Sequence, residues 1–382
     1  MAEKKKLSTL LIQPDADNAP YGALSVPIFQ TSSYKNKFKE EGSYSYTRCS
    51  NPTRASLEKV AAAAEGADYC SAFTSGLAAI NAVFALVTAG QHILAAGDIY
   101  GGTFRLLDEL VSKTGIEVTY GDASELIEFE AAIQENTRLV FIETPTNPLM
   151  KVVDIKAVAE IVKDKNIILV VDNTFMTPVF QLPLELGADV VIHSATKYLC
   201  GHHDTSAGLV ITSNKAIAER VELILRTHGS GLSPFDCFLV KRGMETLCLR
   251  MERHHHNSLK VFEFLKSSPE IASIFYIGDK ESPAYEIVKR QSSGFGGMIA
   301  FNLKSEEKVS TFLNNLELVT FAESLGGNAS LITHPFTQTH ASVPVDVKLK
   351  TGILPTLLRL SVGTEDVEDI IASLQKALES IK

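Results

Sequence analysis

The segment DVVIHSATKYLCGHHD, residues 189–204, changes from a short apolar run directly into hydroxyl groups and a single lysine, Lys197. Lysine is rarely buried unless it is paired or used, because removing an ammonium from water is costly and lowers its pKa. A lysine whose pKa is lowered becomes a nucleophile that can form a Schiff base with an aldehyde cofactor. The segment therefore raises the question of what surrounds Lys197.

Apolar, β-branched runs of this kind alternate with helix-like stretches from residue 57 to about residue 235. The runs are QHILAAGD, IEVTYGD, TRLVFIETP, NIILVVDNT, ADVVIHSAT and AGLVITS. Strands separated by helices need crossover connections, which are typical of an α/β fold with a mainly parallel sheet buried on both faces. Ligands of such sheets bind at the carboxyl ends of the strands, so functional residues are expected directly after these runs.

The pattern along the chain predicts three parts. Residues 1–56 are rich in polar, aromatic and proline positions with little periodicity, and we expect an extended arm that contacts a neighbouring subunit. Residues 57–240 are expected to form a large domain around the parallel sheet. Residues 241–382, with the strand GGMIAFNLK and the terminal helix VEDIIASLQKALESIK, are expected to form a smaller α+β domain.

Composition excludes several classes of function. The chain has 382 residues, 45% of them hydrophobic, and a formal charge of -9, which argues against nucleic-acid binding because that needs a basic surface. Its longest apolar stretch, GLAAINAVFALVTAG, is shorter than a membrane span. Five scattered cysteines without a CxxC pair and an amino terminus without an apolar signal segment favour a reducing cytoplasm.

An aldehyde cofactor needs an anion for its ring nitrogen, a phosphate site and a flat cover. Asp172, at the end of NIILVVD, could be the anion, although a strand-end helix cap explains it as well. Ser75 and Gly76 open a helix whose free N–H groups could bind phosphate, and Ser194 and Thr196 are expected on one face of an extended segment beside it. Tyr100 could stack on the ring, but alone it reads as an ordinary tyrosine.

Arg359 lies among apolar residues in LLRLSVG. An unpaired guanidinium would be costly there. A substrate carboxylate could satisfy it with two hydrogen bonds, and a buried acid could do so equally well.

Seven stretches now appear in order along the chain: YTRCSNPTR, SGLAA, YGGTF, ETPTNP, VVDNTF, SATKYLCGHHD and the pair ESLGG and LRLSVG. Together they resemble the pyridoxal-phosphate-dependent Cys/Met metabolism family over about residues 20–375. That family includes cystathionine γ-lyases, γ-synthases and β-lyases, and methionine γ-lyases. The resemblance implies the aspartate-aminotransferase-like fold (fold type I), pyridoxal 5'-phosphate as the cofactor, and a homotetramer made of paired dimers.

The resemblance also implies a role for each matching residue. Lys197 resembles the cofactor-bound lysine and base, Asp172 the partner of the ring nitrogen, and Tyr100 the stacking tyrosine that assists catalysis. The remaining positions are expected to hold the phosphate (Ser75, Gly76, Leu77, Ser194, Thr196), the neighbouring subunit's phosphate (Tyr46, Arg48), the ring (Thr174) and the substrate (Asn147, Glu323, Ser324, Arg359).

The activity that the resemblance implies is γ-elimination from L-cystathionine, a small amino-acid substrate, in transsulfuration. Glu323 matches the glutamate of γ-lyases and γ-synthases and could engage the distal amino group of cystathionine. Gly102 stands where methionine γ-lyases have a cysteine, which disfavours that activity. A β-elimination side activity, γ-synthase or β-lyase chemistry, and a non-catalytic binding protein remain alternatives.

Two positions depart from the family pattern: His203, where serine is usual, and Asn328 in GGNASL. We expect no metal site. Adjacent positions of HHH at 254–256 point about 100° apart on a helix and cannot converge on one ion, so these histidines are expected on a helix surface. The residues His202, His203 and Asp204 are expected to pack within their loop and not to bind a metal. No GxGxxG or P-loop spacing supports a dinucleotide or nucleotide site.

Overall fold

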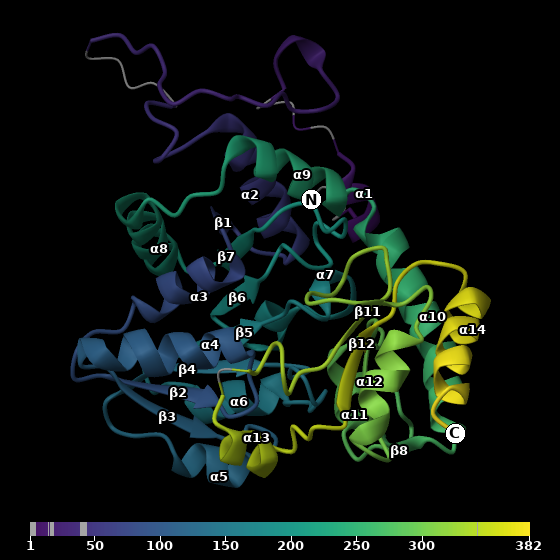
Figure 1. Cartoon of the computed structure of the whole chain (residues 1–382). Helices are drawn as coiled ribbons and strands as arrows, with labels where there is room; N and C mark the ends of the chain where they lie inside the picture. The colour runs from purple at the N-terminus through teal and green to yellow at the C-terminus, as the bar shows by residue number, and fades with distance from the viewer. Residues whose placement is uncertain (1–4, 14, 16–18, 39–43, 342) are drawn as a thin grey trace.

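The computed structural model in Figure 1 describes residues 5–13, 15, 19–38, 44–341 and 343–382. Within them a seven-stranded sheet has the order β1-β7-β6-β5-β4-β2-β3. Only β7 runs antiparallel to its neighbours, and the other strands are parallel. The strands are β1 (Tyr69–Phe73), β2 (His92–Ala96), β3 (Glu117–Gly121), β4 (Thr137–Glu143), β5 (Ile168–Asp172), β6 (Val190–His193) and β7 (Gly208–Thr212).

Helices cover both faces of this sheet. The residues of β7 alternate: Val210 packs with one hydrophobic cluster, whereas Leu209 and Ile211 pack with another. The first cluster includes residues of α3 (Gly76–Phe84), α6 (Ile155–Val162) and α8 (Lys215–His228), and the second includes α2 (Pro52–Ala64) and α9 (Pro234–Met244). The sheet is therefore a central layer, and its apolar strands are buried on both sides, as continuous β-branched runs predict.

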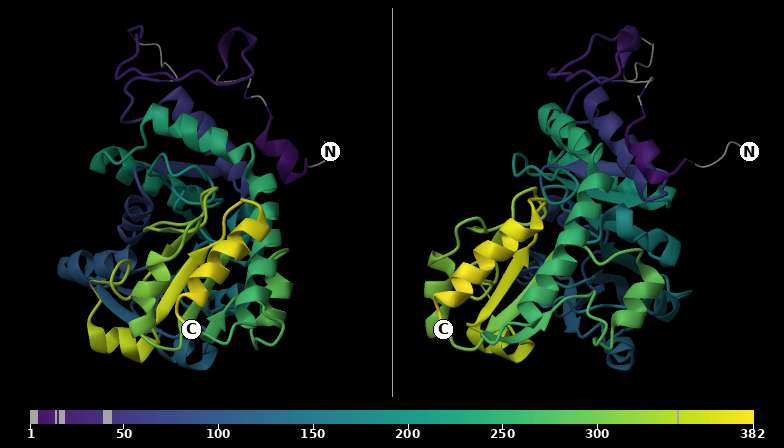
Figure 2. Two further views of the ribbon diagram at one scale, coloured as in Figure 1. Left: turned by 45° about the vertical axis from the view of Figure 1, so that its right-hand side comes forward. Right: turned by 90° about the vertical axis from the view of Figure 1, so that its right-hand side faces the viewer.

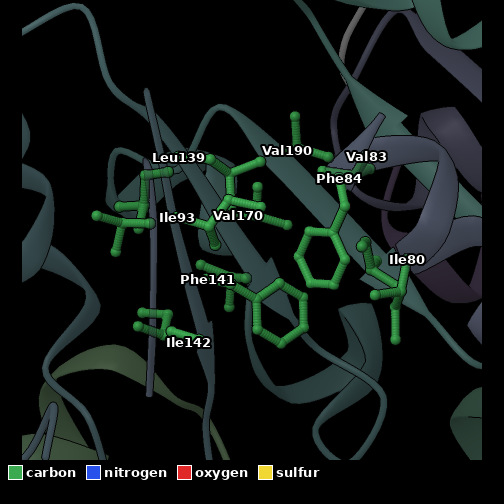
Figure 3. Close-up of a cluster of buried hydrophobic side chains, with 14 of the residues drawn as sticks. Ile80, Val83, Phe84, Ile93, Leu139, Phe141, Ile142, Val170 and Val190 are labelled. Atoms are coloured by element: carbon green, nitrogen blue, oxygen red, sulfur yellow. The ribbon is translucent and has the colours of Figure 1, made fainter. Parts of the chain in front are cut away.

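The first cluster fills the space between the parallel strands and α3. Figure 3 shows Ile80 and Phe84 of α3 facing Phe141 of β4. The rings of Phe84 and Phe141 meet edge to face, with centroids 5.4 Å apart. This packing holds the amino end of α3 near the carboxyl ends of the strands.

A second, five-stranded sheet has the order β10-β11-β12-β9-β8. The long helix α10 (Leu247–Lys266) lies beside it, as the two views in Figure 2 show. The same helix also contacts α7 (Thr177–Phe180) of the larger part. The strands are β8 (Ile271–Phe275), β9 (Met298–Leu303), β10 (Thr320–Phe321), β11 (Leu331–Thr333) and β12 (Leu357–Ser361), packed with α12 (Glu307–Asn314) and α14 (Val367–Glu379).

The remaining elements are short. They are α1 (Leu7–Leu11), α4 (Gly101–Leu106), α5 (Leu126–Ala131), α11 (Tyr285–Gln291), α13 (Val345–Thr351), the 3-10 turns η1 (Pro20–Gly22), η3 (Ser112–Thr114) and η4 (Pro183–Leu186), and the π-helical turn η2 (Leu107–Val111). No helix among the described residues is long and apolar enough to cross a membrane.

The α/β architecture and the mainly parallel sheet are confirmed, and each expected strand of the 92–212 region is present. The boundaries 1–56, 57–240 and 241–382 remain predictions, and α2 runs across the first of them. Residues 1–4, 14, 16–18 and 39–43 of the predicted arm lie outside the described residues.

The expected surface location of the three histidines is wrong for the first of them. His254 is fully buried, and its Nδ1 lies 2.7 Å from the carbonyl oxygen of Val362, while its ring meets Tyr198 edge to face. His256 alone is exposed. Successive helix positions point in different directions, so a run of identical residues spans both the core and the surface.

One buried polar contact joins α2 to the sheet. The Glu65 carboxylate accepts hydrogen bonds from Asn173 Nδ2 at 3.0 Å and from His193 Nε2 at 2.6 Å, and all three side chains are buried. Asn173 directly follows β5, the strand that ends at Asp172. His193 ends β6, the strand that precedes Lys197. Glu65 thus fixes the two strand ends relative to each other.

Replacing Glu65 by alanine should lower the free energy of unfolding by about 2–4 kcal/mol, because two buried donors lose their acceptor. Urea denaturation would measure it. The matched control is Glu130→Ala, which removes an exposed ion pair with Lys165 and should cost under about 0.5 kcal/mol. Equal losses in the two variants would contradict the assigned role of Glu65.

Candidate active site

A cavity of about 230 Å³ lies at the carboxyl edge of the parallel sheet. Its wall is formed by the ends of strands β4 and β5, the turn after β6, the amino end of α3, the residue before α4, the loop 323–325 and strand β12. The site residues predicted from sequence that line it are Ser75, Gly76, Leu77, Tyr100, Asn147, Asp172, Thr174, Ser194, Thr196, Lys197, Glu323, Ser324 and Arg359. The structure brings these residues together, and their roles remain predictions.

Lys197 reaches the cavity from a turn that follows β6. Its Nζ donates to Ser324 Oγ at 3.1 Å, and among the described residues no carboxylate forms an ion pair with it. Burial and the nearby Arg359 together lower the pKa of Lys197 to about 8, although Glu323 acts in the opposite direction. A partly buried amine with this pKa is a competent nucleophile and base.

The expectation that Ser194 and Thr196 lie on an extended segment is wrong. Strand β6 ends at His193, and the chain then turns, with the Lys197 N–H donating to the Ser194 carbonyl at 3.1 Å. Arg250 holds this turn, because its guanidinium donates to the carbonyls of Tyr198 and Leu199. Both hydroxyl residues nevertheless line the cavity.

Ser324, the partner of Lys197, has an unusual backbone. Its φ of 99° lies in a region of backbone conformation that residues other than glycine rarely adopt. The adjoining Gly326 has φ 74°, and a Cβ there would come within 2.8 Å of the Tyr198 backbone nitrogen. The loop that carries Ser324 is thus packed tightly against the residue that follows the lysine.

Asp172 ends β5 and also lines the cavity. Its Oδ1 accepts from the Thr174 N–H at 3.0 Å, and its side chain is buried. Burial raises the pKa of Asp172, whereas the hydrogen bonds from Thr174 and the nearby His193 favour the carboxylate. A cation at this position would be stabilised strongly, since the carboxylate has few other partners.

The amino end of α3 forms a third wall of the cavity. Ser75 is the N-cap, and its Oγ accepts from the Ala78 N–H at 3.1 Å. Gly76 lies so close to Ser194 that a Cβ would come within 2.9 Å of the serine Cβ. The first N–H groups of a helix lack intrahelical acceptors, so this end can bind an anion. Thr196 Oγ1 is already bonded to the backbone of Ala207.

Arg359 on β12 is almost fully buried. It donates to Asn147 Oδ1 at 2.7 Å, to the Ser324 carbonyl at 3.0 Å and to Thr333 Oγ1 at 3.2 Å. Its Nε has no hydrogen-bond partner within the described residues, nor does a carboxylate there form an ion pair with it. Burial lowers the pKa of Arg359 to about 10. An anionic ligand would complete its hydrogen bonding.

Tyr100 is partly exposed over the cavity and starts α4. Its backbone N–H donates to Glu143 Oε2 at 3.0 Å. Gly102 lies beneath the ring, and a Cβ there would fall 2.4 Å from Tyr100 Cε1. The absence of a side chain at residue 102 therefore sets the position of the tyrosine ring.

Sequence reasoning missed Glu143, which lines the cavity at the end of β4 in register with Asp172. The signal was available, because Glu143 ends an apolar run in the same way as Asp172. Thr339 and Ser206 also line the cavity and were not predicted. They stand in loops without periodicity, where sequence offers no comparable signal.

Tyr46 and Arg48 do not line this cavity. Arg48 donates to the carbonyl of Arg226, and the Tyr46 ring is partly exposed. Their predicted role concerns a neighbouring subunit's site, so it stays a prediction.

The two departures from the family pattern meet next to the cavity. The His203 imidazole lies against Gly327, since a Cβ on that glycine would fall 2.0 Å from His203 Nε2. The Asn328 N–H donates to the Gly201 carbonyl at 3.0 Å.

Among the described residues no group of histidine, cysteine or acidic side chains could hold a metal ion.

Comparison with known proteins gives one consistent group. The sequence profile of the Cys/Met metabolism PLP-dependent enzymes matches residues 8–379. The chain is 46% identical to a cystathionine γ-lyase of Bacillus subtilis, covering 94% of this chain and 95% of that protein. It is 48% identical to a cystathionine β-lyase of Lactococcus lactis, covering 94% of each chain.

The fold is also similar to that of a solved crystal structure. The cystathionine γ-synthase of Xanthomonas oryzae, solved in complex with aminoacrylate and cysteine, superposes with a TM-score of 0.96 at 35% identity over 99% of both chains.

Gly102→Ala should weaken pyridoxal phosphate binding about tenfold, because the added Cβ displaces the Tyr100 ring from the cavity. Absorbance titration of the cofactor-free protein measures the affinity. Gly97→Ala is the matched control, since a Cβ at residue 97 meets only the Gly121 carbonyl at an ordinary 3.5 Å. If Gly102→Ala binds pyridoxal phosphate as tightly as the wild type, Gly102 does not set the position of the Tyr100 ring.

Proposed function

Because the chain belongs to the Cys/Met metabolism PLP-dependent enzyme family, we propose that it cleaves L-cystathionine by γ-elimination. The products are cysteine, 2-oxobutanoate and ammonia, and β-elimination accompanies the main reaction. The observation that carries this proposal is the arrangement of one cavity, in which Lys197 shares the wall with Asp172, Arg359 and Glu323. The Lys197 amine has no ion-pair partner among the residues that the structure describes.

The residues present fit pyridoxal phosphate. Asp172 would pair with the ring nitrogen, the amino end of α3 with Ser75 and Ser194 would hold the phosphate, and Tyr100 would cover the ring. The unsatisfied Nε of Arg359 fits a substrate carboxylate. When bound, the cofactor supplies an electron sink that stabilises negative charge at the substrate α-carbon.

The chain's own residues then handle protons. Arg359, positioned by Asn147 at 2.7 Å, orients the substrate carboxylate. Lys197 Nζ takes the α-proton, and a base must move a second proton from the β-carbon before the γ-substituent leaves. Lys197 performs both transfers, assisted by Tyr100, and Ser324 Oγ at 3.1 Å keeps the amine at the cavity.

Glu323 supports γ-elimination over β-elimination. It lines the cavity near both Lys197 and Arg359. A carboxylate at this place suits the distal ammonium of cystathionine. γ-Synthase chemistry, from an acylated homoserine and cysteine, uses the same groups, and the Lactococcus relative supports β-lyase chemistry as a second candidate.

We place Tyr46 and Arg48 at the phosphate of an adjacent subunit, within a homotetramer in the cytoplasm. Neither residue lines the cavity of its own chain, which supports this assignment. A partly exposed tyrosine beside an arginine, with the guanidinium 5.6 Å from the ring centroid, is a suitable pair for contacting a phosphate.

The rate at which cofactor-free protein takes up pyridoxal phosphate should rise with pH up to about pH 8 and then level off. Only the neutral amine of Lys197 attacks the aldehyde, and its pKa of about 8 makes roughly a tenth of it neutral at pH 7. Stopped-flow absorbance measures the rate. A rise that continues to pH 10 would contradict the lowered pKa.

L-Cystathionine should yield cysteine and 2-oxobutanoate as the main products, with a smaller amount of homocysteine and pyruvate. Chromatography of the thiols and oxo acids separates the two outcomes, and Lys197→Ala, which should lose at least about a thousandfold in rate, is the control. Homocysteine as the main thiol would establish β-elimination instead. Turnover only with acylated homoserine and cysteine would establish a synthase.

A further inference from the structure

Glu143 is a buried acid of the cavity that the proposed reaction does not use. It ends β4, and its Cα pairs in register with that of Asp172 on the adjacent parallel strand. Both side chains are buried, and both line the cavity. Residues paired in register on neighbouring parallel strands point to the same face, so the two carboxyl groups lie side by side.

The surroundings of Glu143 contain more negative than positive charge. Besides burial, the charges of Asp172 and Asp98 act to raise the pKa of Glu143, and the charge of Arg359 acts to lower it. The guanidinium of Arg359 directs its hydrogen bonds to Asn147, Ser324 and Thr333, and among the described residues no cation forms an ion pair with Glu143. Two carboxylates at close range in a water-poor site do not both ionise.

The hydrogen bonds indicate which acid keeps the proton. Asp172 accepts from the backbone N–H of Thr174 and interacts with the Thr174 hydroxyl and with His193, all of which favour its charged form. Glu143 accepts a hydrogen bond from the Tyr100 N–H at 3.0 Å, and it has no other hydrogen bond within the described part of the chain. Burial and the neighbouring Asp172 both raise the pKa of Glu143 well above its usual range.

We propose that Glu143 acts as a neutral carboxylic acid that positions Tyr100. Its Oε2 holds the Tyr100 backbone at the start of α4, and its proton leaves the single negative charge of the pair on Asp172. This inference rests on the proposed roles of Asp172 and Tyr100 toward the cofactor. Glu143 itself is a positioning residue, because it works through Tyr100 and Asp172.

A neutral hydrogen-bond acceptor at residue 143 is sufficient to hold the Tyr100 backbone and to leave the negative charge on Asp172. In Glu143→Gln, the amide oxygen can still accept from the Tyr100 N–H, and the amide NH₂ replaces the carboxylic O–H next to Asp172. In Glu143→Ala, the Tyr100 N–H loses its acceptor, and the ring over the cavity loses its anchor. The two variants therefore separate the need for an acceptor from the need for a charge.

The experiment compares both variants and the wild type as cofactor-loaded protein. Three readouts are used: the visible circular dichroism of the bound cofactor, the pH titration of its absorbance, and its dissociation constant. Glu143→Gln should retain the dichroism, titrate within about 0.3 pH unit of wild type and keep kcat/KM within about threefold. Glu143→Ala should bind the cofactor about tenfold more weakly and lose most of the dichroism.

A Glu143→Gln protein whose absorbance titration shifts by about one pH unit or more would show that Glu143 carries charge, and would overturn the proposal. Equal cofactor affinity in Glu143→Ala and wild type would overturn the anchoring of Tyr100. Glu117→Gln, on the exposed start of β3, controls for a general charge effect. If Glu143→Ala does not fold, the absorbance titration of Glu143→Gln decides whether Glu143 is neutral. A wild type without a visible cofactor band would refute the proposed function and not the role of Glu143.

Discussion

The whole site depends on burying the Lys197 amine without giving it a carboxylate. Its contact within the chain is the Ser324 hydroxyl, and desolvation therefore favours the neutral form. An ion pair would have raised the pKa and consumed the nucleophile. Two carboxyl groups of the cavity wall have other contacts, Asp172 with the Thr174 N–H and Glu143 with the Tyr100 N–H. Glu323 acts to raise the pKa of Lys197, but among the described residues it forms no ion pair with the amine.

The parallel sheet makes this arrangement possible. Strands β4, β5 and β6 end at one edge and deliver Glu143, Asp172 and, one turn later, Lys197 to a common cavity. Strand β12 of the second sheet brings Arg359 from the far end of the chain to the same place. The cavity is thus lined by residues from both sheets and the loops that follow them, and neither sheet alone contains all of its charges.

Much of this could be predicted from the sequence, because buried parallel strands are continuous apolar runs and the residues after them are functional. The same rule could have identified Glu143. The turn at 194–197 was mistaken for an extended segment, since periodicity does not reveal where a strand ends. Strand β1 and the strands β8, β11 and β12 depend on tertiary pairing, so sequence patterns define them poorly. The proposed roles of Tyr46 and Arg48 involve a neighbouring subunit, which a single chain does not contain.

Borohydride reduction of the cofactor-loaded protein, followed by peptide mass mapping, tests the central claim most directly. The account predicts that the reduced cofactor is found on the peptide containing Lys197, and that Lys197→Ala carries none. A reduced cofactor on another lysine, or no covalent label on a protein that still binds pyridoxal phosphate, would contradict it.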